Sequence, residues 1–294
     1  MKLYLSGHNY QYALEQSLLS LFPDQRPVYA DTPPDPEEAA AWSTLTVTDS
    51  LATAHAKIQL GGRTGSARFS CPAADLTGGL VTDRLLQRIL KQSFYQAALP
   101  LRDGPPPPWG GLTGIRPAKL ASRALESGMS EAETHTLFRE TYFVSESRTR
   151  LALDAARAGL AAKASLNPDE ISLYIGIPFC PTRCAYCSFV SADVGRALKL
   201  IDPFLDALCR ELAATGAMLA DAGLRVRTVY FGGGTPTTLS APQLDRLMGE
   251  LADHIDLSGC TEYTVEAGRP DTITAEKLAV LARRGCSRVS VNPQ

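Results

Sequence analysis

The sequence carries almost no net charge and no long apolar run. Its 294 residues include 29 lysines and arginines against 31 aspartates and glutamates, which leaves a net charge of −2. Proteins that bind nucleic acid through its phosphates carry an excess of lysine and arginine, so we expect no nucleic-acid partner. No stretch of about 18 uncharged apolar residues is present, and polar residues 6–10 interrupt the apolar core that a signal peptide requires. We therefore expect no membrane span and a cytoplasmic location.

The sequence also lacks a histidine cluster and an even set of cysteines. Its four histidines are dispersed along the chain, and its seven cysteines cannot all pair. Because cytoplasmic thiols stay reduced, the cysteines are expected to be metal ligands or buried thiols rather than disulfides. Four of them are predicted to be small buried apolar residues, namely Cys71, Cys209, Cys260 and Cys286.

Residues 1–165 predict a small α/β or α+β accessory domain. Short strands are expected at 2–5, 44–47, 56–60 and 67–71, with Gly61-Gly62 as a turn, and helices at 10–22, 81–99, 117–126 and 130–164. The segment 103–117 contains four consecutive prolines, which forbid helix and sheet and predict an extended loop.

Residues 170–294 predict a parallel sheet with crossover helices. An apolar strand at 172–177 and further strands at 226–231, 261–265 and 287–291 alternate with three helices. The first helix is expected to have Asp202 as its N-cap, the second to open with a capping box at Ser240, and the third to span 274–284. The fold class is thus α/β, with about four βα units of a partial (β/α) barrel. A complete barrel needs about 250 residues, so we expect the chain to be the N-terminal portion of a longer protein.

Three cysteines follow the first of these strands at a metal-binding spacing. Cys180, Cys184 and Cys187 form a C-x3-C-x2-C pattern within eight residues. Three thiolates on one loop can hold a 4Fe–4S cluster and leave its fourth iron open to a small molecule. The alternative is a set of unrelated or zinc-binding thiols, but structural zinc sites need a fourth ligand, and no second C-x2-C or nearby histidine supplies one.

Two further motifs end the next two predicted strands. Gly232-Gly233-Gly234-Thr235-Pro236-Thr237 follows the second strand, and three glycines let the backbone approach a ligand closely, although such a segment is also found as a bare turn. Glu266 ends the third strand, where the active face of a barrel lies, and its carboxylate is suited to accept hydrogen bonds from ribose hydroxyls. The alternative for Glu266 is a surface glutamate.

The cysteine pattern, preceded by Tyr-Ile-Gly-Ile-Pro-Phe at 174–179, and the GGGTPT segment together resemble the radical S-adenosylmethionine (SAM) superfamily. Within it they resemble the oxygen-independent coproporphyrinogen III oxidases, and the segment Trp109-Gly-Gly-Leu-Thr-Gly-Ile-Arg-Pro117 is similar to a signature of the HemZ-type coproporphyrinogen dehydrogenases. The resemblance implies a radical SAM partial barrel at 170–294, cluster ligation by the three cysteines, and cofactor contacts from Tyr174, Tyr186, Gly233, Gly234, Thr235, Glu266 and Gln294. It leaves Arg116 and Lys119 open: they suit a carboxylate-rich substrate, but solvation or capping of the local backbone is the favoured interpretation.

The same resemblance implies a reaction in porphyrin biosynthesis. A 5′-deoxyadenosyl radical derived from SAM would start the oxidative decarboxylation of coproporphyrinogen III to protoporphyrinogen IX, with an electron donor and an acceptor that the sequence does not identify. One position departs from the oxidases, which carry a further cysteine two residues after the third. Here that position is Phe189. An aromatic residue there resembles the haem-chaperone branch instead, so a haem chaperone and a radical SAM enzyme acting on another substrate stay open as alternatives.

Overall fold

The computed structural model describes residues 1–35, 38–114, 116–189 and 192–292. The chain forms two compact units, an N-terminal unit of Met1–Ser165 and a C-terminal unit of Leu166–Gln294. Within the described residues, no helix has both the length and the apolarity to cross a membrane.

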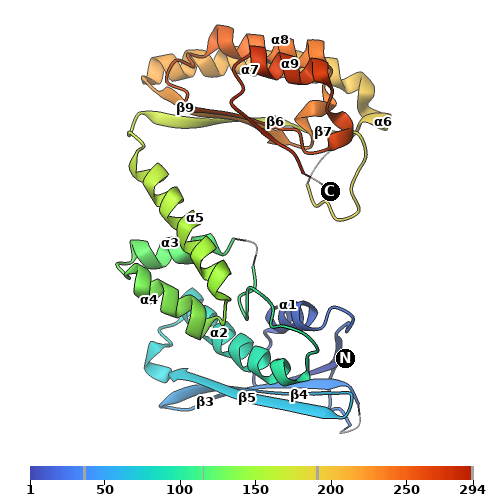
Figure 1. The fold of residues 1–294 in the computed structure, drawn as a ribbon, viewed down its shortest axis with the longest axis vertical. Coiled ribbons are helices and arrows are strands. Elements are labelled where there is room, and N and C mark those ends of the chain that lie inside the picture. Colours follow the sequence, from blue (N-terminus) through green and yellow to red (C-terminus); the bar gives the residue numbers. More distant parts are fainter. Residues whose placement is uncertain (36–37, 115, 190–191, 293–294) are drawn as a thin grey trace. The chain divides into compact units, whose positions relative to one another are not determined.

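The N-terminal unit is built on a five-stranded mixed sheet (Figure 1). Its strands lie in the order β2-β1-β3-β4-β5: β1 Lys2–Ser6, β2 Val28–Ala30, β3 Ala40–Val47, β4 Leu51–Leu60 and β5 Arg63–Pro72. β1 pairs in parallel with both β2 and β3, and β3, β4 and β5 form an antiparallel meander. The predicted turn between β4 and β5 is confirmed: Gly61 and Gly62 have φ of 56° and 75°, and such a two-residue turn requires positive φ at both positions.

Two helices bury their apolar faces against this sheet. α1 spans Gln11–Leu21 and α2 spans Gly79–Ala98. Leu14 and Leu18 of α1 pack in one core with Ile89 and Phe94 of α2, and β4 contributes alternate residues that include Ile58. The period of two along β4 is what a strand with one buried face requires.

A second core in this unit joins three shorter helices. They are α3 Ala118–Glu126, α4 Glu131–Thr136 and α5 Glu146–Ala164. The prediction of one helix over 130–164 is wrong, because a π-helical turn at 137–141 ends α4 and Ser145 caps a new helix. Between them Phe143 adopts a φ of 57° and stacks on Tyr95 of α2, with ring centroids 5.2 Å apart. Packing of this aromatic ring therefore overrides the local helical pattern.

The C-terminal unit is a four-stranded parallel sheet covered on one face by three helices (Figure 1). The strands are β6 Glu170–Ile177, β9 Arg225–Gly233, β10 Glu262–Glu266 and β11 Arg288–Ser290, in the order β11-β10-β9-β6. The helices are α7 Ile201–Ala222, α8 Ala241–His254 and α9 Ala275–Arg283. This arrangement confirms the predicted α/β class with its crossover helices.

The sequence predicted the start of α8 correctly and the start of α7 incorrectly. The capping box at Ser240 is confirmed: its side chain accepts from the backbone N–H of Gln243, and the side-chain oxygen of Gln243 accepts from the backbone N–H of Ser240. Asp202 is not the N-cap of α7, because a 3-10 turn at 198–200 runs straight into the helix and α7 begins at Ile201. Asp202 instead accepts a hydrogen bond from the side chain of Gln243 at 2.8 Å, which ties α7 to α8.

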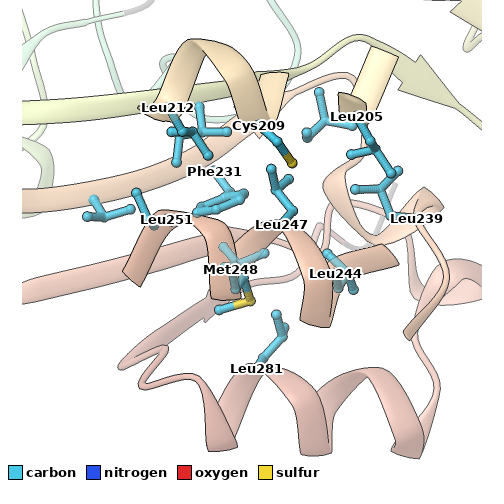
Figure 2. Close-up of a cluster of buried hydrophobic side chains, with 14 of the residues drawn as sticks. Leu205, Cys209, Leu212, Phe231, Leu239, Leu244, Leu247, Met248, Leu251 and Leu281 are labelled. Carbon is cyan, nitrogen blue, oxygen red and sulfur yellow. The ribbon is translucent and has the colours of Figure 1, made fainter. Parts of the chain in front are cut away.

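The core of the C-terminal unit lies between the sheet and these helices (Figure 2). Phe231 of β9 meets Leu205, Cys209 and Leu212 of α7, Leu244, Leu247, Met248 and Leu251 of α8, and Leu281 of α9. Cys209 is buried among these side chains, as predicted, and Cys71 is buried in the other unit, whereas Cys260 and Cys286 are only half-buried. A dry, continuous core on one face fixes the register of the strands, and hence the position of the residues that follow them.

Candidate functional site

A cavity of about 270 Å³ lies beyond the carboxyl ends of β6, β9 and β10. Parallel strands direct their carboxyl ends to one edge of a sheet, so motifs far apart in the chain meet there. Of the predicted site residues, the structure brings these to the cavity: Cys180, Cys184, Tyr186, Cys187, Gly233, Gly234, Thr235 and Glu266. Phe189 lines the same cavity, with 69% of its surface exposed.

The cysteine loop begins and ends at one short pair of parallel strands. β7, Phe179–Cys180, pairs with β8, Ala192–Asp193, so the intervening segment is closed at its base. Within the loop, the backbone N–H of Cys187 donates to the carbonyl oxygen of Cys184 at 3.1 Å. The loop thus presents three thiols to one cavity from a fixed base.

The glycine segment packs directly against the base of this loop. The backbone N–H groups of Gly234 and Thr235 donate to the carbonyl oxygens of Ile177 and Phe179, both at 2.8 Å. A Cβ added at Gly234 would lie 2.6 Å from the Phe179 oxygen and 3.0 Å from the Cys180 sulfur. Since nothing larger than glycine fits there, the closeness of the two motifs depends on Gly234. Thr235 completes the contact, because its hydroxyl donates to the Cys180 sulfur at 3.5 Å.

Glu266 is held by a tyrosine on the neighbouring strand. The Tyr230 hydroxyl donates to Oε1 of Glu266 at 2.5 Å, and this bond to a carboxylate raises the pKa of Tyr230 to about 12. Tyr174 stacks on Tyr230, with ring centroids 5.8 Å apart. Tyr174 does not line the cavity within the described residues, so its link to the site runs through Tyr230 and Glu266. The remaining predicted contact, Gln294, lies outside the described residues.

Arg269 is a site residue that the sequence did not single out. Its guanidinium donates to the Thr182 hydroxyl at 2.7 Å and to the Cys184 sulfur at 3.8 Å. A bidentate pair with Asp271, at 3.1 Å for both bonds, holds the guanidinium in place and lowers the pKa of Asp271. The only sequence signal is a basic residue shortly after Glu266, which does not reveal a partner 87 residues earlier. Arg269 therefore connects the cysteine loop to the segment that follows β10.

Lys277 binds the carboxyl-terminal end of the glycine segment. Its ammonium donates to the carbonyl oxygens of Thr237 and Thr272 at 2.6 and 3.0 Å, and burial lowers its pKa. The hydroxyls of the same two threonines lie 2.6 Å apart. The end of the GGGTPT segment is thereby fixed to the turn before α9.

The three cysteine thiols that line the cavity suit a 4Fe–4S cluster better than a single metal ion. Within the described residues, no three histidine, cysteine or acidic side chains converge closely enough to hold one metal ion. A structural zinc ion needs four ligands around one point, whereas in a 4Fe–4S cluster each thiolate binds a different iron. Three separated thiols around one cavity, with Gly234 leaving room beside Cys180, fit the cluster.

Comparison with known proteins finds a family match within the C-terminal unit. Residues 174–294 match the radical SAM superfamily. The C-terminal unit carries a radical SAM domain. That family uses a 4Fe–4S cluster together with SAM, in agreement with the donor set at the cavity.

Individual relatives add detail. The oxygen-independent coproporphyrinogen-III oxidase-like protein HemZ of Bacillus subtilis (strain 168) is 44% identical over 189 residues, which are 63% of this chain and 38% of the relative. The heme chaperone HemW of Lactococcus lactis is 38% identical over 123 residues, 42% of this chain and 30% of the relative. Among solved structures, the coproporphyrinogen III oxidase HemN of Escherichia coli, a radical SAM enzyme, is 32% identical over 46% of this chain and 30% of its own, with a TM-score of 0.38. The chain spans about a third of the length of these relatives.

Proposed function

We propose that the protein catalyses the oxygen-independent oxidative decarboxylation of coproporphyrinogen III to protoporphyrinogen IX in the cytoplasm, by a 5′-deoxyadenosyl radical derived from SAM. One observation carries this choice. The 189 residues aligned with HemZ outnumber those of the segment 174–294, so the similarity continues into the chain before the radical SAM domain. The 123 residues aligned with HemW exceed the 121 residues of that segment by only two.

Different residues of the chain would then bind the two cofactors, the 4Fe–4S cluster and SAM. The reduced cluster and SAM together would supply a carbon radical that abstracts hydrogen from a propionate side chain. Loss of carbon dioxide from that side chain, and of one electron to an electron acceptor, would then leave the vinyl group. Cys180, Cys184 and Cys187 would hold the cluster, and the backbone of Gly233 and Gly234 with Thr235 would meet the amino group of SAM. Glu266 would accept from the ribose hydroxyls, oriented by its bond from Tyr230. Tyr186, beside Cys187 and 75% exposed, would lie against the cofactor.

A second function, that of a haem chaperone, is favoured by one residue. Phe189 stands where the oxidases carry a further cysteine, and its exposed ring lines the cavity. An apolar ring at this place suits contact with a flat macrocycle and adds no ligand. In this alternative the same cluster is present, but haem is bound and not converted.

The deciding experiment uses the gene product, reconstituted with iron and sulfide without oxygen. With a chemical reductant, SAM and coproporphyrinogen III, we expect protoporphyrinogen IX to form in a SAM-dependent manner, measured by chromatography after oxidation to the porphyrin. Formation of 5′-deoxyadenosine without protoporphyrinogen IX would reject the decarboxylation, and tight haem binding would then favour the chaperone.

Paired cysteine variants provide the control. Cys184→Ser should abolish the cluster absorbance and both products. Cys260→Ser should leave them unchanged, since Cys260 is not among the described residues that line the cavity and its thiol donates to the Glu262 carbonyl oxygen at 3.3 Å, a bond that serine retains. A brown, SAM-cleaving Cys184→Ser protein would show that the cluster is held elsewhere.

A further inference from the structure

The N-terminal unit contains a second cavity, of about 380 Å³, that the proposed reaction does not use. One wall is α2, another is α3 with the residues before it, and Thr141 and Tyr142 close the end. The side chain of Gln92 donates to the Thr141 carbonyl oxygen at 2.9 Å, which fastens the α2 wall to that end. The cavity is therefore formed by packed elements.

The α2 wall presents a stripe of positive charge. Arg84, Arg88 and Lys91 line the cavity together with Gln87 and Gln92, at the i, i+3, i+4, i+7 and i+8 spacing of one helix face. Arg84 and Arg88 stand four residues apart, an arrangement in which like charges destabilise a helix. A solvated helix face normally mixes charges of both signs, and this stripe does not.

The facing wall repeats the arrangement. Arg116, Lys119 and Arg123 line the cavity, and the last two again stand four residues apart on α3. No aspartate or glutamate lines the cavity in the part of the chain that the structure describes. Six cations therefore share one hollow without a compensating acid.

Among the described residues, these cations also have no ion-pair or side-chain hydrogen-bond partners elsewhere. Across residues 1–35, 38–114, 116–189 and 192–292, none of the six takes part in an ion pair or donates a side-chain hydrogen bond, while other arginines such as Arg157 and Arg246 pair with nearby carboxylates. Burial lowers the pKa of Lys91, and no carboxylate offsets that effect. An anionic ligand would relieve both the mutual repulsion and the uncompensated burial.

Part of the remaining lining is apolar. Leu112, Leu120 and Tyr142 form part of the same surface, beside the loop from Gly111 to Gly114. An inorganic anion would leave these side chains unused, whereas an extended polynucleotide is bound along open grooves and not in a hollow of this size. The lining matches a ligand with several carboxylates attached to an apolar body, because guanidinium groups recognise carboxylates through paired hydrogen bonds.

We propose that this cavity binds the carboxylate-bearing edge of an organic polyanion with an apolar body and, resting on the proposed function, that this ligand is the tetracarboxylate tetrapyrrole. Arg116 and Lys119 then contact the ligand, in contrast to the solvated role favoured by the sequence. The N-terminal unit becomes a place where the substrate is captured before, or apart from, its conversion.

The test measures binding of coproporphyrin III, the stable oxidised tetracarboxylate, to the full 294-residue chain by porphyrin fluorescence. All proteins in the series carry Cys180→Ala, Cys184→Ala and Cys187→Ala, so that no cluster chemistry contributes. Adding Arg88→Gln and Lys91→Gln should weaken binding at least tenfold, since two charge-assisted contacts are lost. Arg68→Gln, an exposed arginine of β5 outside the cavity, should change affinity less than twofold.

Two comparisons make the proposal falsifiable. Mesoporphyrin IX, which has two carboxylates on a similar ring, should bind several-fold more weakly than coproporphyrin III. Without ligand, the Arg88→Gln, Lys91→Gln protein should melt at the same or a higher temperature, because like-charge repulsion is removed, and a lower melting temperature would indicate a structural role instead.

Unchanged affinity in that variant, or equal binding of both porphyrins, would overturn the proposal. So would binding of a single-stranded oligonucleotide that depends on the same two residues while porphyrin binding does not. Because the series lacks the cluster cysteines, failure of the decarboxylation assay leaves this result intact, and failure here leaves the radical chemistry intact.

Discussion

Arg269 places a positive charge and a hydrogen-bond donor beside one predicted cluster ligand, the Cys184 sulfur. Hydrogen bonds and positive charge near ligand sulfurs favour the reduced state of an iron–sulfur cluster. Arg269→Met should therefore lower the reduction potential of the reconstituted cluster by tens of millivolts. The measurement is a redox titration followed by electron paramagnetic resonance.

Arg183 supplies the matched control for Arg269. It lines the same cavity, but among the described residues its side chain donates no hydrogen bond to a cysteine. Arg183→Met should leave the potential closer to that of the unmodified protein. Equal shifts in both variants would mean that overall charge, and not the bond to Cys184, sets the potential.

The bond between Tyr230 and Glu266 predicts a pH dependence with a definite sign. The Glu266 carboxylate stabilises the protonated phenol and raises the pKa of Tyr230 from its usual value near 10 to about 12. A raised folded-state pKa contributes stability below about pH 10, which is lost as the pH rises through about 12. Glu266→Gln should bring the Tyr230 midpoint down by a unit or more.

That midpoint is read from tyrosinate absorbance. The chain has ten tyrosines, so the signal of Tyr230 is isolated by subtracting the titration of a Tyr230→Phe protein. A midpoint unmoved by Glu266→Gln would show that burial, and not the carboxylate, raises the pKa.

Among the structural elements, the turn after β9 leaves no room for a residue larger than glycine at position 234. A Cβ at Gly234 would overlap the Phe179 carbonyl oxygen and crowd the Cys180 sulfur. Gly234→Ala should lower the free energy of unfolding of the C-terminal unit by about 1–3 kcal/mol, the usual cost of forcing an extra group into a packed site. Urea denaturation followed by circular dichroism measures this loss.

Gly259 provides the comparison within the same unit. A Cβ there would come no closer than 3.7 Å to the Val226 carbonyl oxygen. Gly259→Ala should change stability by less than about 0.5 kcal/mol, the range of an ordinary surface substitution. Similar losses in both alanine variants would count against crowding as the cause.

The elements that the sequence predicted well are those with local signals. The strands that became β6, β9, β10 and β11 alternate with helical segments along the sequence, and the Ser240 box and the Gly61-Gly62 turn each lie within a few residues. The break after α4 was missed because its cause is the stacking of Phe143 on Tyr95, which belongs to another helix. Arg269 was missed for the same reason, since its partner Thr182 is remote in the chain. Local patterns thus predicted elements and motifs, but not the contacts that only the fold creates.

At the scale of the whole molecule, the two units have separate hydrophobic cores and differ in their tryptophan content. Both tryptophans, Trp42 and Trp109, belong to the N-terminal unit. Leu247→Ala, at a fully buried position of the C-terminal unit, should cost that unit about 2–5 kcal/mol. We expect the denaturant midpoint from tryptophan fluorescence to stay fixed while part of the circular dichroism signal is lost earlier.

Leu90→Ala, at an equally buried position of α2, is the reciprocal variant. It should move the fluorescence midpoint to lower denaturant. Should Leu247→Ala move that midpoint just as far, the two units would unfold as one cooperative structure.

The order of strands in the radical SAM sheet has a consequence for protein synthesis. The strands of this sheet lie in chain order, so that β9 pairs with β6, β10 with β9 and β11 with β10. The sheet can therefore grow as the polypeptide leaves the ribosome, and the cysteine loop emerges before the segments that wall it in. Thr235 follows Cys180 by 55 residues, which corresponds to roughly 3–11 s at about 5–20 residues per second. During those seconds the cysteine thiols of the nascent chain are exposed, and both a donor of iron and sulfide and an oxidant can reach them.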